Sequence, residues 1–265
     1  MNWFLRRFHG VLQQESLAER LGRMQRAALY AVLAATAFVW SNAVVNVVSF
    51  PQLPLALDWL NVLGAWLGWS AALGLLGLIA GWFVEEYQGI VGGGVIFTLL
   101  LAGAFFFQMD NASTAQSVLM ALPLLGVGML AAGGLRWAAR RHQAIVQSEG
   151  AFSPRMVRHV AVIVLAGAFV GVLGRMDLPA ERALSNLHAY LQAAPHEAAV
   201  RTKLPVRQVP SLPEHFGQDY RFYVRRSGFA VASLDVTIRF ADGFVLVCVV
   251  PVGNTNFFTD CWEAK

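Results

Sequence analysis

Long apolar stretches recur along the first two thirds of the chain, separated by short polar segments. A transmembrane helix needs about 20 predominantly apolar residues, with a range of about 17–25. We predict five spans on this basis, at about 27–50, 60–84, 90–107, 117–135 and 159–175. The fifth is the weakest, because its uninterrupted apolar run covers only Val160 to Gly174, and a buried helix of a soluble domain is the alternative. The first is too long for a signal peptide and is followed by further spans, so we interpret it as an uncleaved anchor.

Residues 1–26 predict a cytoplasmic amphipathic arm. Apolar residues such as Trp3 and Phe8 recur at helical spacing, with arginines between them. We expect this arm to lie on the inner leaflet, or to pack on the protein's own spans or on a partner. Ser16 and Glu19 match a capping box, which predicts that a helix begins at Leu17.

The pattern changes after residue 176. Residues 179–194 have helical spacing, and residues 201–216 contain three prolines and predict an irregular linker. Apolar and polar residues then alternate over 232–240, which is typical of a half-buried strand. We predict returning strands at about 244–250 and 257–262 and a further one at 220–225, which together form an antiparallel sheet of three to four strands.

Asp242-Gly243 is the dipeptide favoured in a two-residue type I′ hairpin. Such a turn would pair Phe240 with Val245 and Val236 with Val249, and place all four side chains on one face. The predicted fold is therefore a membrane all-α bundle of about five transmembrane helices over residues 27–176. It is followed, over residues 177–265, by a small extracytoplasmic α+β domain with a helix, a Pro-containing linker and the antiparallel sheet.

The composition supports a membrane location. Of the 265 residues, 57% are hydrophobic and only 14% are charged, and the mean hydropathy is +0.53. A soluble domain has about 25% charged residues. The values therefore exclude a disordered chain, a nucleic-acid-binding module and an ordinary soluble enzyme. The net charge is nevertheless +4, and the basic residues are unevenly distributed along the chain.

Ten of the eleven basic residues in the first 176 positions fall into two stretches, before the first span and between the fourth and fifth. These predicted topology-setting residues are Arg6, Arg7, Arg20, Arg23, Arg26, Arg136, Arg140, Arg141, Arg155 and Arg158. The segments 51–59 and 108–116 contain no Lys or Arg. Because short cytoplasmic loops collect Lys and Arg, we expect a cytoplasmic N-terminus, five crossings of a plasma (bacterial inner) membrane and an extracytoplasmic C-terminal domain. No nucleic-acid partner is expected, since both stretches adjoin spans.

Small residues line several predicted spans. The predicted helix-packing residues are Gly64, Gly68, Ser70, Gly74, Gly77, Gly81, Gly167 and Gly171. Small residues let helix backbones approach closely in lipid, either inside the bundle or, in the second span, against a helix of a partner. Asn42 and Asn46 share one face of the first span. We expect structural hydrogen bonds from them, with the lining of a solute path as the alternative.

Both cysteines, Cys248 and Cys261, lie in the predicted sheet. A short turn between their strands would place them opposite each other, so we predict a cross-strand disulfide. Two free buried thiols are the alternative. A disulfide would agree with an extracytoplasmic domain, because disulfides persist outside the cytoplasm.

The sequence contains no pattern that identifies catalytic or metal-binding residues, and it implies no cofactor. The apolar runs of the predicted spans contain no Asp, Glu, Lys, Arg or His, and His159 and Arg175 lie at the edges of the fifth. Proton relays and ion-coupled transporters normally need an ionisable group inside the membrane. His188, His196 and His215 match no zinc-ligand spacing. We therefore expect a non-enzymatic, structural or accessory membrane subunit that contacts lipids and other membrane subunits. A transporter or channel for a neutral or apolar solute and a sensor with a ligand-binding outer domain are the alternatives.

Overall fold

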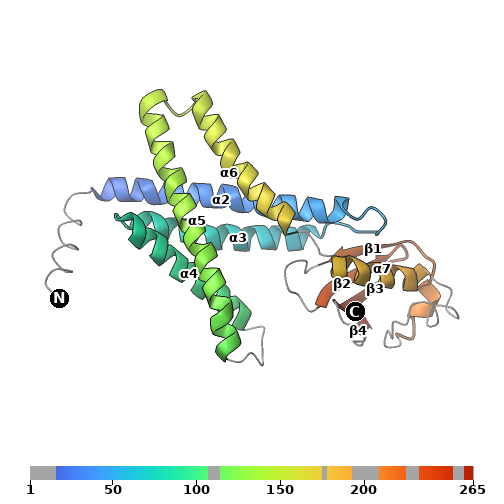
Figure 1. The fold of residues 1–265 in the computed structure, drawn as a ribbon. Coiled ribbons are helices and arrows are strands. Elements are labelled where there is room, and N and C mark those ends of the chain that lie inside the picture. Colours follow the sequence, from blue (N-terminus) through green and yellow to red (C-terminus); the bar gives the residue numbers. More distant parts are fainter. Residues whose placement is uncertain are drawn as a thin grey trace. The chain divides into compact units, whose positions relative to one another are not determined.

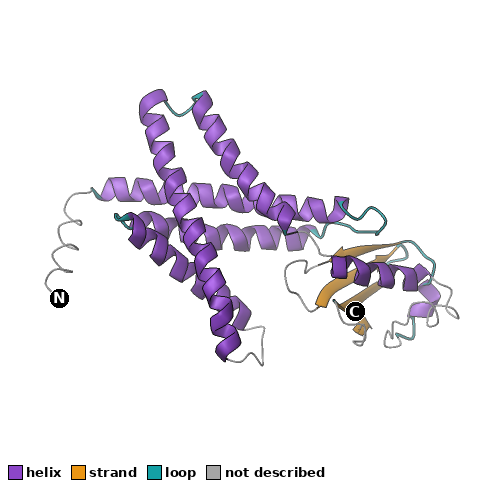
Figure 2. Ribbon diagram, in the orientation of Figure 1, coloured by secondary structure: helices purple, strands orange, loops and turns teal. Residues whose placement is uncertain are grey.

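The computed structural model describes residues 16–106, 114–174, 178–192, 209–224, 233–252 and 260–264. The described chain is mostly helical, and its strands belong to the C-terminal part (Figures 1 and 2). It forms two compact units, Met1–Phe38 with Ala65–Ala168, and Val39–Gly64 with Phe169–Lys265. Residues 1–15 of the predicted amphipathic arm, with Arg6 and Arg7, lie outside the described residues, as does the linker segment up to residue 208. The remainder of the predicted arm, from Leu17 onward, is the first part of α2.

Five long helices precede the C-terminal domain. They are α2 (Leu17–Val48), α3 (Trp59–Trp82), α4 (Glu86–Phe106), α5 (Thr114–Glu149) and α6 (Pro154–Leu173). The predicted capping box is confirmed. The Ser16 amide donates to Glu19 Oε2 at 3.1 Å and the Glu19 amide donates to Ser16 Oγ at 3.3 Å, and α2 begins at Leu17. Helix α5 continues 14 residues beyond the predicted span end at 135, so the second basic stretch is largely helical.

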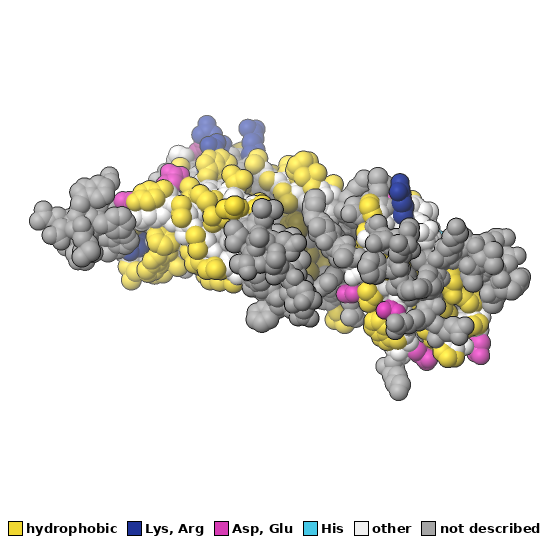
Figure 3. All heavy atoms as spheres, turned by 60° about the horizontal axis from the view of Figure 1, so that its bottom comes forward, with side chains coloured by type: hydrophobic (Ala, Val, Ile, Leu, Met, Phe, Trp, Pro, Cys, Tyr) yellow, Lys and Arg dark blue, Asp and Glu magenta, His cyan; other side chains and the backbone are white. Residues whose placement is uncertain are grey.

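Four helices within the described residues are long and apolar enough to cross a membrane: Leu17–Val48, Trp59–Trp82, Leu122–Glu149 and Pro154–Leu173. They are consistent with an integral membrane protein, and hydrophobic side chains cover much of their visible surface (Figure 3). Only 17% of the apolar window of α6 is buried, which does not favour the alternative of a buried soluble helix. Helix α4 covers most of the predicted span 90–107, but its side chains from residue 101 onward lie outside the description.

Alanines make up half of the core of the first unit. This core comprises Tyr30, Ala31, Leu76, Ala80, Phe97, Ala132, Leu135 and Ala138, contributed by α2, α3, α4 and α5. Its four alanines are fully buried. Helices that meet at alanine or glycine can bring their backbones close together, which compensates for the absence of a hydrophobic driving force between helices in lipid.

The second unit contains a four-stranded antiparallel sheet of order β1-β2-β3-β4. Its strands are β1 (Tyr220–Val224), β2 (Ser233–Phe240), β3 (Val245–Pro251) and β4 (Asp260–Glu263), and η1 (Leu212–His215) precedes them. Helix α7 (Leu178–Gln192) packs on one face of the sheet (Figure 1), where Leu184, Leu187 and Leu191 join the core. The predicted helix and all four predicted strands are therefore present.

The predicted register of the β2–β3 hairpin is wrong by one residue. Val245 pairs with Arg239 instead of Phe240, and the Phe240 amide donates to the Phe244 carbonyl at 2.9 Å. The connection is thus a three-residue loop ending in Gly243, whose φ of 94° is the left-handed conformation typical of such loops. The side chains of β3 that enter the core are consequently Leu246, Cys248 and Val250, and not Val245, Val247 and Val249.

The connection between α2 and α3 also joins this sheet. Leu55 forms a parallel bridge with Phe222 of β1. The Phe222 amide donates to the Pro54 carbonyl, and the Ala56 amide donates to the Phe222 carbonyl, both at 2.8 Å. Leu55 and the nearby Leu53 are buried in the same core as the strands. The edge of β1 is therefore covered by a segment that lies far away in the sequence, a contact that the sequence did not predict.

Candidate functional site

Two arginines form hydrogen bonds with carbonyl groups at the C-terminal end of α3, within the first unit. Arg136 of α5 is fully buried, and its guanidinium donates to the carbonyls of Ala80, Phe83 and Val84. Arg23 of α2 donates from Nε to the Gly81 carbonyl at 2.7 Å. The last carbonyls of a helix lack partners within the helix and carry the negative end of its dipole. Two residues predicted only to set the topology therefore also fasten three helices together.

Gly89 of α4 provides the space that Arg136 occupies. A Cβ at this position would collide with Arg136 Nη1 and would lie 2.7 Å from the Ala80 carbonyl oxygen. Sequence analysis missed this arrangement. The sequence gives one signal that Arg136 is buried, because its neighbours Leu135, Trp137 and the two following alanines are apolar. No feature of the sequence connects Arg136 to the end of α3.

The two basic stretches lie at the same end of the first unit. Arg26 of α2 donates to Gln143 Oε1 of α5 at 2.9 Å. Arg20 lies over the ring of Trp82, 6.0 Å from its centroid, and Arg140 forms an ion pair with Glu86 at 2.9 Å. The remaining described members, Arg141, Arg155 and Arg158, line a cavity between α5 and α6. The structure thus brings together residues more than a hundred positions apart.

A cluster around Tyr30 joins α2, α5 and α6 at this end. The Tyr30 hydroxyl lies 2.9 Å from His142 Nδ1 and donates to Met156 Sδ at 3.8 Å. His159 is buried, stacks edge-on against Tyr30 and places Nε2 3.0 Å from the Ala138 carbonyl oxygen. Because a carbonyl only accepts hydrogen bonds, this Nε2 carries the proton. These contacts link α2, α5 and α6.

Five of the predicted packing glycines fall into two groups. A Cβ at Gly77, Gly81 or Gly167 would lie 2.7, 2.7 and 2.6 Å, respectively, from a backbone atom of α2. These three positions require glycine because no Cβ contact is that short. In contrast, a Cβ at Gly64 or Gly68 of α3 would meet nothing within 4 Å. Close contacts within the chain therefore explain the first three glycines but leave Gly64 and Gly68 unexplained.

The other predicted packing residues lie inside the structure. Ser70 is half-buried and Gly171 is buried. A Cβ at Gly74 would touch a methyl group of Val32 at 3.7 Å, which is ordinary van der Waals contact. Alanine would therefore fit at Gly74, unlike at the close-contact glycines.

The amide of Asn42 holds the end of α6 within the second unit. Its Nδ2 donates to the carbonyls of Gly171 and Gly174, at 3.0 and 2.8 Å. Asn46 Nδ2 in turn donates to Asn42 Oδ1 at 3.2 Å. The Asn42 side chain is thus engaged by groups of the chain itself, which supports the structural interpretation over the lining of a solute path.

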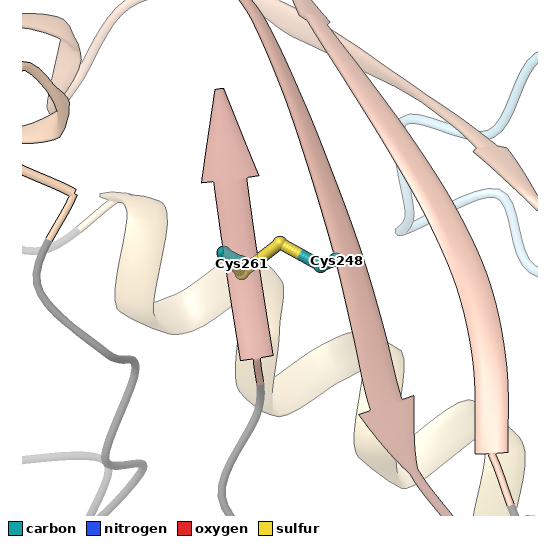
Figure 4. Close-up of a disulfide and its surroundings, with 2 residues drawn as sticks. All are labelled: Cys248 and Cys261. Atoms are coloured by element: carbon teal, nitrogen blue, oxygen red, sulfur yellow. A yellow bond between two sulfur atoms is a disulfide. The ribbon is translucent and has the colours of Figure 1, made fainter. Parts of the chain in front are cut away.

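The predicted disulfide is present. Cys248 of β3 and Cys261 of β4 are directly opposite each other in the sheet, and their sulfurs are bonded at 2.03 Å (Figure 4). Both residues belong to the buried core of the second unit. The disulfide fastens the short strand β4 to the remainder of the sheet.

The histidines of the C-terminal domain serve separate contacts. His188 Nδ1 lies 2.7 Å from the Tyr220 hydroxyl; burial lowers the pKa of His188 and raises the pKa of Tyr220 to about 12. His215 pairs with Asp242 at 2.7 Å and stacks on Phe244. His196, the third predicted histidine, is outside the described residues. Across the described ranges, no three His, Cys, Asp or Glu side chains are grouped so as to hold a metal ion.

Comparison with known proteins adds no family to this picture. No protein-family model matches the chain, and neither a curated protein nor a solved structure is significantly similar to it.

Proposed function

We propose that this chain is a non-enzymatic, multi-pass membrane protein that acts as a structural or accessory subunit of a larger membrane complex. It would span the membrane five times, with a cytoplasmic N-terminus and the disulfide-bonded domain on the extracytoplasmic side of a plasma (bacterial inner) membrane. The observation that carries this proposal is the pair of open glycines on α3, Gly64 and Gly68.

Glycine weakens a helix by about 0.5–1 kcal/mol relative to alanine, so an isolated glycine usually has a packing reason. Gly77, Gly81 and Gly167 have one, since each touches the backbone of α2. Gly64 and Gly68 have the spacing of a helix-association motif, but their surface is open and adjoins exposed Leu67. A transmembrane helix of a partner subunit could approach there as closely as α2 approaches elsewhere.

The polar contacts also support a scaffold. The side chains of Arg136, Tyr30 and Asn42 all bind groups on other helices of the chain. A solute path would need polar groups directed into a passage, whereas these bonds hold helices in fixed positions. They support a subunit that presents a rigid surface over the alternative of a transporter.

Two observations support the proposed orientation. The arginines of α2 and α5 lie at one end of the first unit, as expected for a cytoplasmic end. The disulfide belongs to the C-terminal domain, and disulfides form and persist outside the cytoplasm.

The test is to extract the tagged full chain from its native membrane in mild detergent, and to measure the size of the complex on native gels and its subunits by mass spectrometry. Gly64→Leu combined with Gly68→Leu should release a stoichiometric membrane partner. Gly126→Leu is the matched control, because a Cβ at Gly126 of α5 also meets nothing within 4 Å. It should leave the complex intact.

A chain that elutes alone, or a double variant that keeps its full complement of subunits, would contradict the proposal. Differently tagged copies of the chain, expressed together, identify a second copy as the partner if one tag recovers the other. Protein folding is checked in each variant by the intact disulfide and an unchanged unfolding midpoint.

A further inference from the structure

A basic cavity lies between the C-terminal part of α5 and the first turns of α6, which form a helical hairpin (Figure 1). Its volume is about 430 Å³, within the range of about 300–1,000 Å³ that holds small ligands. Helix α5 contributes Trp137, Arg141 and Ile145, one turn apart along one face. Helix α6 contributes two further arginines, Arg155 and Arg158, together with His159 and Val162.

The cavity carries a positive charge that the described residues neutralise only in part. Three guanidinium groups face one nearby carboxylate, that of Glu149, which forms an ion pair with Arg155. The Arg141 guanidinium lies over the ring of Trp137, 5.8 Å from its centroid. Within the described residues, neither Arg141 nor Arg158 forms an ion pair. Both side chains are exposed. Their hydrogen-bond donors are therefore available to an anion.

The cavity lies where the apolar parts of two helices end. The apolar part of α5 ends at Leu135, just before the cavity residues, and in α6 Arg155 and Arg158 precede the apolar run that begins at residue 160. Val162 and Leu165 lie on the same face of α6 as Arg158, one and two turns further along the helix, and are 54% and 67% exposed. A molecule that binds here meets cations at one end and an open apolar surface at the other.

We propose that this cavity binds an anionic phospholipid. Its phosphate would accept hydrogen bonds from Arg141 and Arg158, since guanidinium groups form strong, often paired hydrogen bonds with phosphate oxygens. The Trp137 ring lies at the boundary between headgroups and acyl chains, where tryptophan is enriched. An acyl chain lies along Val162 and Leu165. Basic pockets between transmembrane helices at the cytoplasmic face are suited to anionic headgroups, and this site is separate from the open glycines of α3.

The test uses the full chain in a neutral detergent and measures lipid binding by native mass spectrometry. The probes are dioleoylphosphatidylglycerol and, as the neutral control, dioleoylphosphatidylcholine. Arg141→Gln combined with Arg158→Gln should weaken phosphatidylglycerol binding by about thirtyfold, or about fivefold per arginine, to the level of phosphatidylcholine. Arg140→Gln is the matched control, because Arg140 is adjacent and exposed but pairs with Glu86 and does not line the cavity.

Two further experiments distinguish the effect of cavity volume from that of charge, and a lipid headgroup from a free phosphate ester. Val162→Trp fills the cavity without changing its charge and should also weaken phosphatidylglycerol binding. Glycerol phosphate has the same anionic group without acyl chains, and an excess of it should not displace the lipid. Equal binding of the two lipids, unchanged binding by the double arginine variant, an equal loss in Arg140→Gln, or full displacement by glycerol phosphate would each overturn the proposal.

Discussion

The buried guanidinium of Arg136 offers the sharpest test of how the helices are held together. Replacing Arg136 with leucine removes three hydrogen bonds to the end of α3. Hydrogen bonds from a charged donor contribute about 1.5–3 kcal/mol each, and the cost of burying the cation offsets part of their sum. Because the carbonyls also lose their partner, we expect Arg136→Leu to lower the free energy of unfolding by about 3–5 kcal/mol.

Two further variants of this test isolate the cause. Lysine at position 136 keeps the charge but cannot reach three carbonyls at once, so Arg136→Lys should lose about half as much stability. The matched control is Arg140→Leu. Its ion pair with Glu86 is exposed, with side chains 47% and 59% accessible, and exposed pairs contribute at most about 1 kcal/mol. Arg140→Leu should therefore remain close to the wild type.

The measurement is unfolding of the detergent-solubilised chain by added sodium dodecyl sulfate, followed by far-ultraviolet circular dichroism. An Arg136→Leu protein within about 1 kcal/mol of the wild type would refute this account, because it would mean that the α3 carbonyls need no partner. Equal destabilisation by Arg140→Leu would refute it as well, since any loss of positive charge at this end would then suffice.

Three further predictions concern the packing, the disulfide and the pH response. Gly77→Val places a Cβ 2.7 Å from the Ala27 carbonyl oxygen and should destabilise the first unit by several kcal/mol, measured in the same unfolding assay; an unchanged midpoint would contradict the close contact. Replacing Cys248 and Cys261 with serine opens a loop of 13 residues and should cost about 3 kcal/mol, seen as faster proteolysis of the C-terminal domain, and equal proteolysis rates would contradict this. Burial raises the pKa of Tyr220 from 10 to about 12. Because the hydroxyl then ionises first in the unfolded chain, the free energy of unfolding should be unaffected by Tyr220 below pH 10 and fall by up to about 2 kcal/mol toward pH 12. Tyr220→Phe should lack this decline in a comparison of unfolding midpoints across that range, and a parallel decline in both proteins would contradict the assignment.

Local patterns predicted the elements well where the physical signal is short-ranged. Ser16 and Glu19 identify the start of α2 because a capping box needs only four consecutive residues. The alternation over β2 and the positions of both cysteines predicted the disulfide for the same reason. The hairpin register was wrong because Asp242-Gly243 is compatible with two loop lengths. The core distinguishes them, since only the three-residue loop places Leu246 inside.

Long-range contacts of the candidate site were not predictable from one chain. The sequence identifies Arg136 and Arg23 only as topology-setting residues, because their position beside apolar stretches is the only feature visible in it. That they meet the end of α3 depends on how three helices pack. Likewise, the pattern of glycines in α3 is uniform, yet Gly81 touches α2 whereas Gly68 is open. Only the structure separates these roles.

The bridge between Leu55 and Phe222 also constrains how the chain threads through a bilayer. Segments that pair in one sheet lie on the same side of the membrane, so the chain between them must cross an even number of times. That stretch contains α3, α4, α5 and α6, of which three have full-length apolar spans within the described residues. If these three cross, parity requires α4 to cross too. Together with a crossing by α2, this would give the five proposed crossings, and the parity argument does not depend on the positions of the arginines.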